Sequence, residues 1–181
     1  ICDYLKTEKG TAYEANQVVL SNGGKQSLLQ SMLALCDPGD EVIIPAPYWV
    51  SYTQMAVMCG ASSVIIPTKE EESYCLQPEA LEAVLGPRSR VLILCNPSNP
   101  TGAVHPAALL ERLAAVLRKW PRVVVIADEI YEQITYDEPQ CVLRKPQSRG
   151  RTVARGLTLW LTPARPLLWW TQCGVCVAPR D

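Results

Sequence analysis

A glycine pair, an indole, an amide, a carboxylate and a phenol each follow a short apolar run in this 181-residue chain. Together these residue types could bind a small phosphorylated ligand that carries a flat, cationic ring. Asp128 and Tyr131 are three residues apart, so both side chains would face one side of a helical turn. The full set of candidate site residues is Gly23, Gly24, Lys25, Trp49, Asn99, Asp128 and Tyr131.

Each of these features also has a purely structural explanation. Gly23-Gly24 is either a phosphate cradle at a helix N-terminus or a simple strand-to-helix turn. Trp49 stacks on a ring or packs in the core. Asn99 donates to a ligand or builds an Asx turn, and Asp128 pairs with a buried cation or caps the next element.

The glycine turn does not match the motifs that bind ATP or NAD. Lys25 is followed by Gln26, and the upstream glycine of a Walker loop is missing. The spaced glycines of a dinucleotide site are missing too. The turn therefore favours a smaller phosphorylated ligand.

Alternating strands and helices must position these residues. Apolar runs over 18–20, 42–44, 64–66, 91–94 and 123–127 alternate with helical patterns over 28–35, 49–59, 78–86 and 106–117. Strands that are apolar on both faces predict an α/β fold, with a mostly parallel sheet and helices on both of its faces. Ligands bind beyond the carboxyl ends of such strands, where the candidate residues stand.

Composition excludes several function classes. Hydrophobic residues make up 48% of the chain, enough for a core, and no apolar run reaches the roughly 18 residues of a membrane helix. A net charge of −1 gives no case for nucleic acid, so neither a membrane nor a nucleic acid is an expected partner. His105 is the one histidine, which makes a Ser-His-Asp triad or a multi-histidine metal site hard to assemble, and no metal is expected.

The cysteines predict a reducing compartment. Four of them lie in or beside apolar segments, as free thiols do: Cys36, Cys59, Cys75 and Cys95. Cys173-Gly174-Val175-Cys176 has redox or zinc spacing, but without a second pair we expect no function from it. No secretory or transit signal follows Ile1, so we expect a cytoplasmic protein, with a plastid as the alternative.

Charge changes sign near residue 140. Residues 1–141 carry 10 Lys/Arg and 17 Asp/Glu. Residues 142–181 carry 7 Lys/Arg and 1 Asp/Glu, and they contain three of the five tryptophans. We therefore expect one domain over 1–140 and an unrelated, poorly ordered basic tail over 141–181. This tail is either the product of a frameshift or splicing error, or a basic module that binds nucleic acid or membrane.

Four ordered blocks resemble the class I aminotransferases of fold type I, in the aspartate and prephenate aminotransferase branch. They cover most of residues 1–140: SNGGKQS (21–27), DPGDEVIIPAPYWVSY (37–52), CNPSNPTGAVHP (95–106) and ADEIYEQITYD (127–137). The resemblance implies part of a large domain that binds pyridoxal 5′-phosphate. It further implies transfer of an amino group from an aspartate- or glutamate-type amino acid to a 2-oxo acid, by a homodimer with shared sites.

The resemblance also implies a role for each candidate residue. Gly23, Gly24 and Lys25 would hold the cofactor phosphate, mainly through backbone amides. Trp49 would stack on the ring and Asn99 would bond its 3-oxygen, and both would help to bind substrate. Asp128 would pair with the ring nitrogen, and Tyr131 would bond the 3-oxygen, as the two catalytic residues.

One departure from the family matters most. The family carries a Ser-x-x-Lys motif about thirty residues after the position of Asp128, and its lysine binds the cofactor covalently. The last lysine here is Lys145, only 17 residues after Asp128 and without the serine. We therefore expect a truncated fragment that is inactive as a 181-residue chain. A non-catalytic cofactor-binding or interaction module is the alternative.

Overall fold

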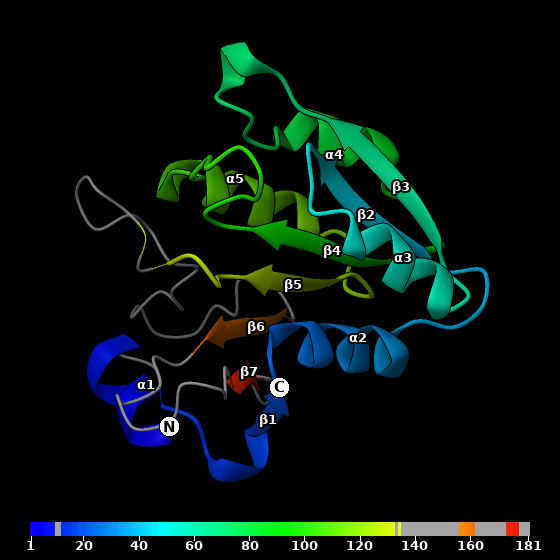
Figure 1. Cartoon of the computed structure of the whole chain (residues 1–181). Helices are drawn as coiled ribbons and strands as arrows, with labels where there is room; N and C mark the ends of the chain where they lie inside the picture. The colour runs from blue at the N-terminus through cyan, green and yellow to red at the C-terminus, as the bar shows by residue number, and fades with distance from the viewer. Residues whose placement is uncertain (10–11, 133, 135–155, 162–172, 178–181) are drawn as a thin grey trace.

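The computed structural model describes residues 1–9, 12–132, 134, 156–161 and 173–177. Its centre is one seven-stranded sheet with the strand order β1-β7-β6-β5-β4-β2-β3 (Figure 1). The strands are β1 (Val18–Asn22), β2 (Glu41–Ala46), β3 (Ser62–Pro67), β4 (Ser89–Cys95), β5 (Val124–Asp128), β6 (Gly156–Leu161) and β7 (Cys173–Val177). The helices are α1 (Cys2–Lys9), α2 (Gly24–Leu35), α3 (Ser51–Met58), α4 (Pro78–Val84) and α5 (Ala107–Leu117), with short 3-10 turns at Ala15–Gln17 and Glu70–Glu72.

Five neighbouring strands form the parallel part of the sheet. β3, β2, β4, β5 and β6 pair in parallel, and β7 runs antiparallel to both β6 and β1. The predicted α/β fold with a mostly parallel sheet is thus confirmed. Among the described residues, no helix is long and apolar enough to cross a membrane.

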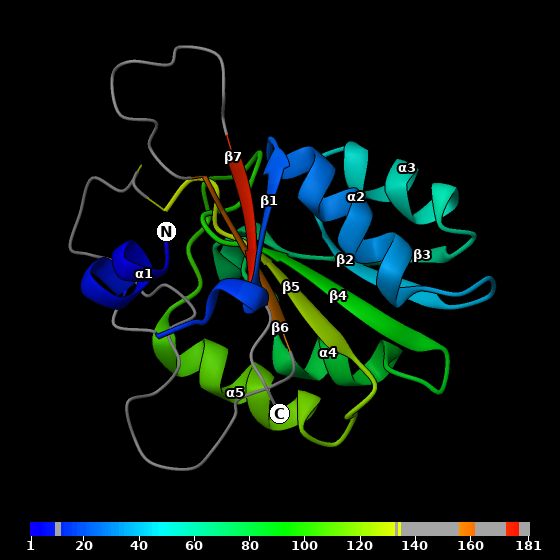
Figure 2. The same cartoon turned by 90° about the horizontal axis from the view of Figure 1, so that it is seen from below.

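Helices cover both faces of the sheet, as Figure 2 shows, with α2 and α3 on one side and α4 and α5 on the other. Alternate residues of the central strands enter two separate cores. Val42 and Val91 pack with α2 and α3, whereas Ile43 and Leu92 pack with α4 and α5. This division explains the continuous apolar runs, because each residue of a doubly covered strand is buried whichever face it points to.

Local sequence fixes the start of α2. Gly23 has a φ of 87°. This conformation is unfavourable for residues that carry a Cβ atom, but glycine adopts it readily. The chain can therefore turn sharply from β1 into α2 at this point. The other predicted helices also form, with bounds that differ by a few residues from those expected.

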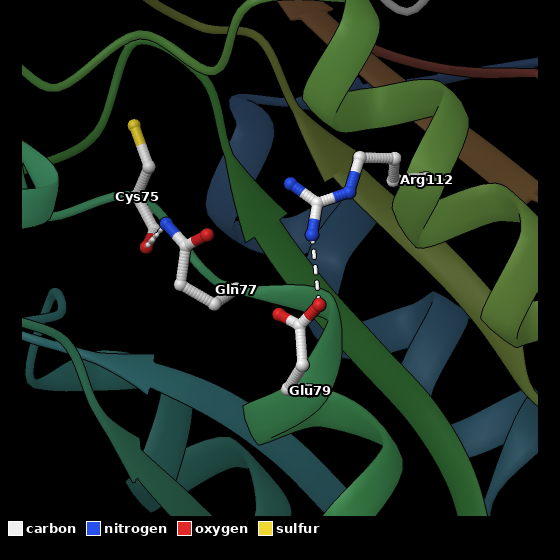
Figure 3. A network of polar contacts seen from close by, with 4 residues as sticks. All are labelled: Cys75, Gln77, Glu79 and Arg112. Atoms are coloured by element: carbon white, nitrogen blue, oxygen red, sulfur yellow. Dashed lines mark hydrogen bonds and ion pairs between the residues drawn. The ribbon is translucent and has the colours of Figure 1, made fainter.

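An ion pair joins α4 to α5 on the surface. The Arg112 guanidinium donates to Glu79 Oε1 at 2.8 Å, and both side chains are more than half exposed (Figure 3). The same view shows Cys75 and Gln77 on the segment that leads into α4, where Gln77 Nε2 donates to the Cys75 carbonyl at 3.1 Å. This segment follows the Glu70–Glu72 turn and leads into α4.

Two strands lie within residues 142–181, where the sequence predicted no element. β6 pairs in parallel with β5, and β7 joins β6 to β1 in the same sheet. Trp160 lies in β6, and Cys173 and Cys176 lie in β7. The rest of the predicted tail, including Trp169 and Trp170, lies outside the described residues, so the boundary at residue 140 stays a prediction.

Candidate functional site

The predicted site residues stand at one edge of the sheet. β1 is antiparallel to β7, which is antiparallel to β6, so β1 points in the same direction as the parallel strands. The carboxyl ends of β1, β2, β4 and β5 therefore meet at one edge. Gly23 and Gly24 follow β1, Trp49 follows β2, Asn99 follows β4, and Asp128 ends β5.

Asp128 places a carboxylate in a nearly dry position at this edge. Its side chain is among the buried polar groups, with 7% of the residue exposed. Asp128 Oδ2 accepts a hydrogen bond from the Tyr52 hydroxyl at 2.8 Å, and Oδ1 accepts one from the Ile130 amide at 3.3 Å. Burial raises the pKa of Asp128 above its usual value, and these two hydrogen bonds oppose that rise.

Tyr52 is a site residue that the sequence analysis missed. It lies on α3 with 2% of the residue exposed, and its ring meets Trp49 edge-on, with 5.5 Å between the centroids. Burial and the nearby Asp128 carboxylate raise the pKa of Tyr52, so its hydroxyl keeps the proton that it donates. The spacing of Trp49 and Tyr52, three residues apart at a helix start, was the signal available in the sequence.

The glycine turn reaches the same group of residues. Lys25 Nζ lies 4.9 Å from the centroid of the Trp49 ring, close enough for a cation–π contact. A Cβ built on Gly24 would meet the Ile130 side chain at 3.8 Å, so the turn lies against the residues that follow Asp128. Gly24 and Lys25 open α2, and helix geometry leaves their amides without intrahelical partners.

Asn99 and Tyr131 also come together. Asn99 Nδ2 donates to the Tyr131 hydroxyl at 3.3 Å, which joins the loop after β4 to the turn after β5. The Asn96 amide donates to the Asp128 carbonyl at 2.9 Å and continues the pairing of these two strands. The structure thus brings two polar pairs to the edge, Asn99 with Tyr131 and Tyr52 with Asp128. Lys145 lies outside the described residues.

Cys95 ends β4 directly beside Asp128. The two residues are register partners across β4 and β5, and the Cys95 thiol donates to the Pro97 carbonyl at 3.2 Å. Burial, with the nearby Asp128 carboxylate, raises the pKa of Cys95 to about 11, so the thiol is neutral at pH 7. Cys2, Cys36, Cys59, Cys75 and Cys95 are free thiols.

Fold and site together define an α/β protein with a candidate ligand site at the carboxyl ends of its strands, built from a helix N-terminus, an indole and a buried carboxylate. The sequence profile of the family "Aminotransferase class I and II" matches residues 1–157. The chain belongs to this family, and the likeness continues past residue 140.

Relatives of known function agree. The chain is 54% identical over 132 residues to the bifunctional aspartate aminotransferase and glutamate/aspartate-prephenate aminotransferase of Petunia hybrida, covering 73% of this chain and 28% of that protein. It is 43% identical over 138 residues to the aspartate/prephenate aminotransferase of Cereibacter sphaeroides, covering 76% and 34%. The chain therefore spans about a third of the length of these curated relatives.

Solved structures share the fold. The aspartate aminotransferase of Rhizobium meliloti superposes with a TM-score of 0.86 at 36% identity, covering 98% of this chain and 44% of that chain. A tetra mutant of the Thermus thermophilus aspartate aminotransferase superposes with a TM-score of 0.85 at 32% identity, covering 98% and 47%. At these identities the likeness supports both the fold and the family.

Proteins of this family depend on pyridoxal 5′-phosphate, and the residues at the sheet edge fit that group. The amides that open α2 suit its phosphate, and Trp49 suits its flat ring. The strongest fit is Asp128. It is a buried carboxylate with a raised pKa, and in the described part of the chain its hydrogen-bond donors are neutral. A cationic ring nitrogen would stabilise its charge.

Proposed function

We propose that this chain is part of an enzyme that transfers an amino group between an amino acid and a 2-oxo acid with pyridoxal 5′-phosphate. The buried Asp128 carboxylate at the end of β5 carries this proposal, because it is placed to hold a cationic group in a dry site. The names of the relatives given above support donors of the aspartate and glutamate type. A homodimeric assembly of the intact protein, which the family resemblance implies, stays a prediction.

Each residue at the edge has a part in this function. The amides of Gly24 and Lys25 bind the phosphate, and Trp49 packs on the ring. Asp128 holds a proton on the ring nitrogen, and with that proton the bound cofactor supplies an electron sink for the α-carbon of the amino acid.

Three further side chains orient these groups. Tyr52 fixes the Asp128 carboxylate through its 2.8 Å hydrogen bond. Asn99 and Tyr131, already in contact with each other, present an amide and a phenol to the oxygen of the ring. Both of these groups can therefore bond the 3-oxygen from neighbouring positions.

We propose that the 181-residue chain binds the cofactor without catalysing transamination. No lysine follows Lys145, and Lys145 lacks the serine of the family motif. Without that lysine, covalent capture of the cofactor and proton transfer at the substrate carbon lack their usual group. The cytoplasmic or plastid location stays a prediction.

Equilibrium dialysis of the purified chain with pyridoxal 5′-phosphate tests the binding site. The Asp128→Asn substitution keeps the shape of the side chain but removes its charge. We expect it to weaken cofactor binding about tenfold, which corresponds to the loss of about 1.4 kcal/mol of binding free energy from one ion pair. Glu111→Gln, at an exposed position of α5, is the matched control and should leave binding unchanged. Equal binding by the Asp128→Asn variant would refute the cofactor site.

Borohydride treatment and peptide mapping test the inactivity. We expect no specific fixed adduct and no turnover of aspartate with a 2-oxo acid. An adduct mapped to Lys145 together with turnover would overturn this part of the proposal. A full-length transcript with a Ser-x-x-Lys motif downstream would identify the chain as part of an enzyme, whereas its absence would favour a non-catalytic cofactor-binding module.

A further inference from the structure

A pair of serine hydroxyls adjoins the glycine turn that opens α2. Ser21 is in β1, and its hydroxyl donates to the Gly23 carbonyl at 2.8 Å. The hydroxyl oxygens of Ser21 and Ser27 are also in hydrogen-bond contact. Ser27 lies in the first turn of α2, and only 1% of this residue is exposed. Neither serine is among the predicted site residues.

The direction of these two hydrogen bonds follows from the number of protons. A serine hydroxyl has one proton, and a carbonyl oxygen can only accept. The proton of Ser21 is therefore used in the bond to Gly23, so Ser27 must be the donor to Ser21 Oγ. The two hydroxyls form a chain of donors that runs from Ser27 through Ser21 to the Gly23 carbonyl.

The Gly23 carbonyl is held by donors from β1 and from α2. The Gln26 amide donates to it at 3.2 Å and the Ser27 amide at 3.5 Å, as expected where a helix begins. The Ser21 hydroxyl adds the shortest of the three bonds, at 2.8 Å. The carbonyl is therefore fixed in a direction along α2, towards the body of the helix.

The peptide bond between Gly23 and Gly24 transmits this constraint to the candidate site. The bond is trans, and in a planar trans peptide the C=O and N–H bonds point in opposite directions. Because the Gly23 carbonyl points along α2, the Gly24 amide must point out beyond the start of the helix. This amide is one of the two that we propose to bind the phosphate, and it has no intrahelical partner.

Two adjacent glycines need such a restraint. Neither residue has a Cβ atom, so the backbone alone leaves the orientation of the peptide between them loosely defined. On the outer side of the turn, the Asn22 amide donates to Gln26 Oε1 at 2.7 Å, but Gln26 is exposed and water competes for this bond. The bonds made by Ser21 are better protected, because the donor to Ser21 is the buried Ser27 hydroxyl.

We propose that Ser21 is a positioning residue for the phosphate site: its hydroxyl, oriented by Ser27, holds the Gly23 carbonyl so that the Gly24 amide is presented to the anion. Ser21 gives its proton to the carbonyl, so it acts through the peptide and not by donating to the phosphate. An amide that is oriented before the ligand arrives loses less conformational freedom on binding. This inference rests on the proposed function, because its ligand is the phosphate of pyridoxal 5′-phosphate.

A single nuclear magnetic resonance signal reports on both ends of this peptide. Gly23-Gly24 is the one pair of adjacent glycines in the sequence. If glycine is labelled with 15N and with 13C at its carbonyl, an HNCO spectrum gives one correlation, between the Gly23 carbonyl carbon and the Gly24 amide. In the ligand-free chain, Ser21→Ala should move the carbonyl carbon upfield, because the carbonyl loses a hydrogen bond. An unchanged carbonyl signal would overturn the proposal.

Cofactor binding tests what the orientation does. In equilibrium dialysis with pyridoxal 5′-phosphate, we expect Ser21→Ala to weaken binding about fivefold, as the loss of one hydrogen bond implies. The downfield shift of the Gly24 amide proton on cofactor addition should also become smaller. Ser21→Thr keeps the hydroxyl and should restore both readouts. Ser31→Ala is the matched control, since it removes another buried hydroxyl from α2, one that donates to the Ser27 carbonyl, and it should bind as the wild type does.

The outcomes separate this inference from the proposed function. Wild-type affinity in Ser21→Ala, or an equal loss in Ser21→Thr and Ser21→Ala, would overturn the positioning role and leave the cofactor site in place. A wild-type Gly24 amide that does not respond to the cofactor would refute the phosphate site and this inference with it. Circular dichroism checks that each variant is folded. If Ser21→Ala does not fold, Ser27→Ala takes its place, because it removes the donor that orients Ser21, and a wild-type affinity would overturn the proposal equally.

Discussion

Mild acid should destabilise this fold through one imidazole. His105 is buried, and its pKa falls from 6.5 to about 4 on folding because burial disfavours the charged form. Between these two values the unfolded chain binds a proton that the folded chain does not. The stabilising effect of the neutral ring is therefore complete above the unfolded pKa and is lost as the pH falls from 6.5 towards 4.

The size of the effect follows from this difference in bound protons. One pKa unit corresponds to about 1.4 kcal/mol, so the full span corresponds to about 3 kcal/mol. Between pH 7 and pH 5 the imidazole of His105 takes up most of a proton in the unfolded chain but stays largely neutral in the folded chain. The free energy of unfolding therefore falls by about 2 kcal/mol over this range. This is a large share of the 5–15 kcal/mol typical of a folded domain.

Other groups around the imidazole do not titrate in this range. The neighbouring thiols Cys75 and Cys95 both have raised pKa values because they are buried, about 11 for Cys95. Tyr52, which lines a small cavity together with His105, also has a raised pKa. Asp128, whose pKa is also raised by burial, is present in the wild-type chain and in a variant without the imidazole, so a difference in pH dependence between the two chains is assigned to His105.

Urea unfolding at pH 7 and pH 5, followed by circular dichroism, measures the loss. His105→Gln is the comparison, since its side-chain carbonyl can replace His105 Nε2 as the acceptor for the Leu76 amide but does not titrate. We expect the wild-type chain to lose about 2 kcal/mol more than the variant between these pH values. Equal losses in both chains would refute the assignment of a neutral, buried imidazole.

Three further changes test the packing and the site by urea unfolding at pH 7. Tyr52→Phe leaves Asp128 Oδ2 without its hydroxyl donor and should cost about 1–3 kcal/mol, and an unchanged midpoint would contradict that bond. Leu92→Ala empties a fully buried position and should cost about 2–5 kcal/mol, whereas a cost below about 1 kcal/mol would contradict the two-core packing. Arg112→Ala breaks an exposed pair with Glu79 and should cost less than about 1 kcal/mol, and a larger loss would show that the pair is stronger than its exposure implies.

The centre of the sheet could be predicted from the sequence because local pattern determines it. The runs of β2, β4 and β5 are apolar at successive positions, as a strand covered on both faces requires. Once their direction is known, Asp128 and Asn99 must lie at one edge of the sheet. The order of the candidate residues along the chain therefore carried most of the information about the site.

Pairings between distant segments could not be predicted in this way. The hydrogen bond from Tyr52 to Asp128 joins residues 76 positions apart, and no local pattern marks it. β6 and β7 were not predicted, and their pairing with β5 and β1 joins segments that are far apart in sequence. The neutral His105 was also missed, since a lone histidine in a loop gives no sign of its burial.

The pairing of β1 with β7 has a consequence for the order of folding. Val18 pairs with Val177, and Asn22 pairs with Cys173, so β1 and β7 join segments about 150 residues apart in the sequence. On a ribosome β1 emerges long before its partner, and it must wait until Cys173–Val177 have been made. Contacts of such long sequence separation form slowly, because a large loop has to close first. The glycine turn after β1 should therefore be among the last parts of the molecule to reach its native place.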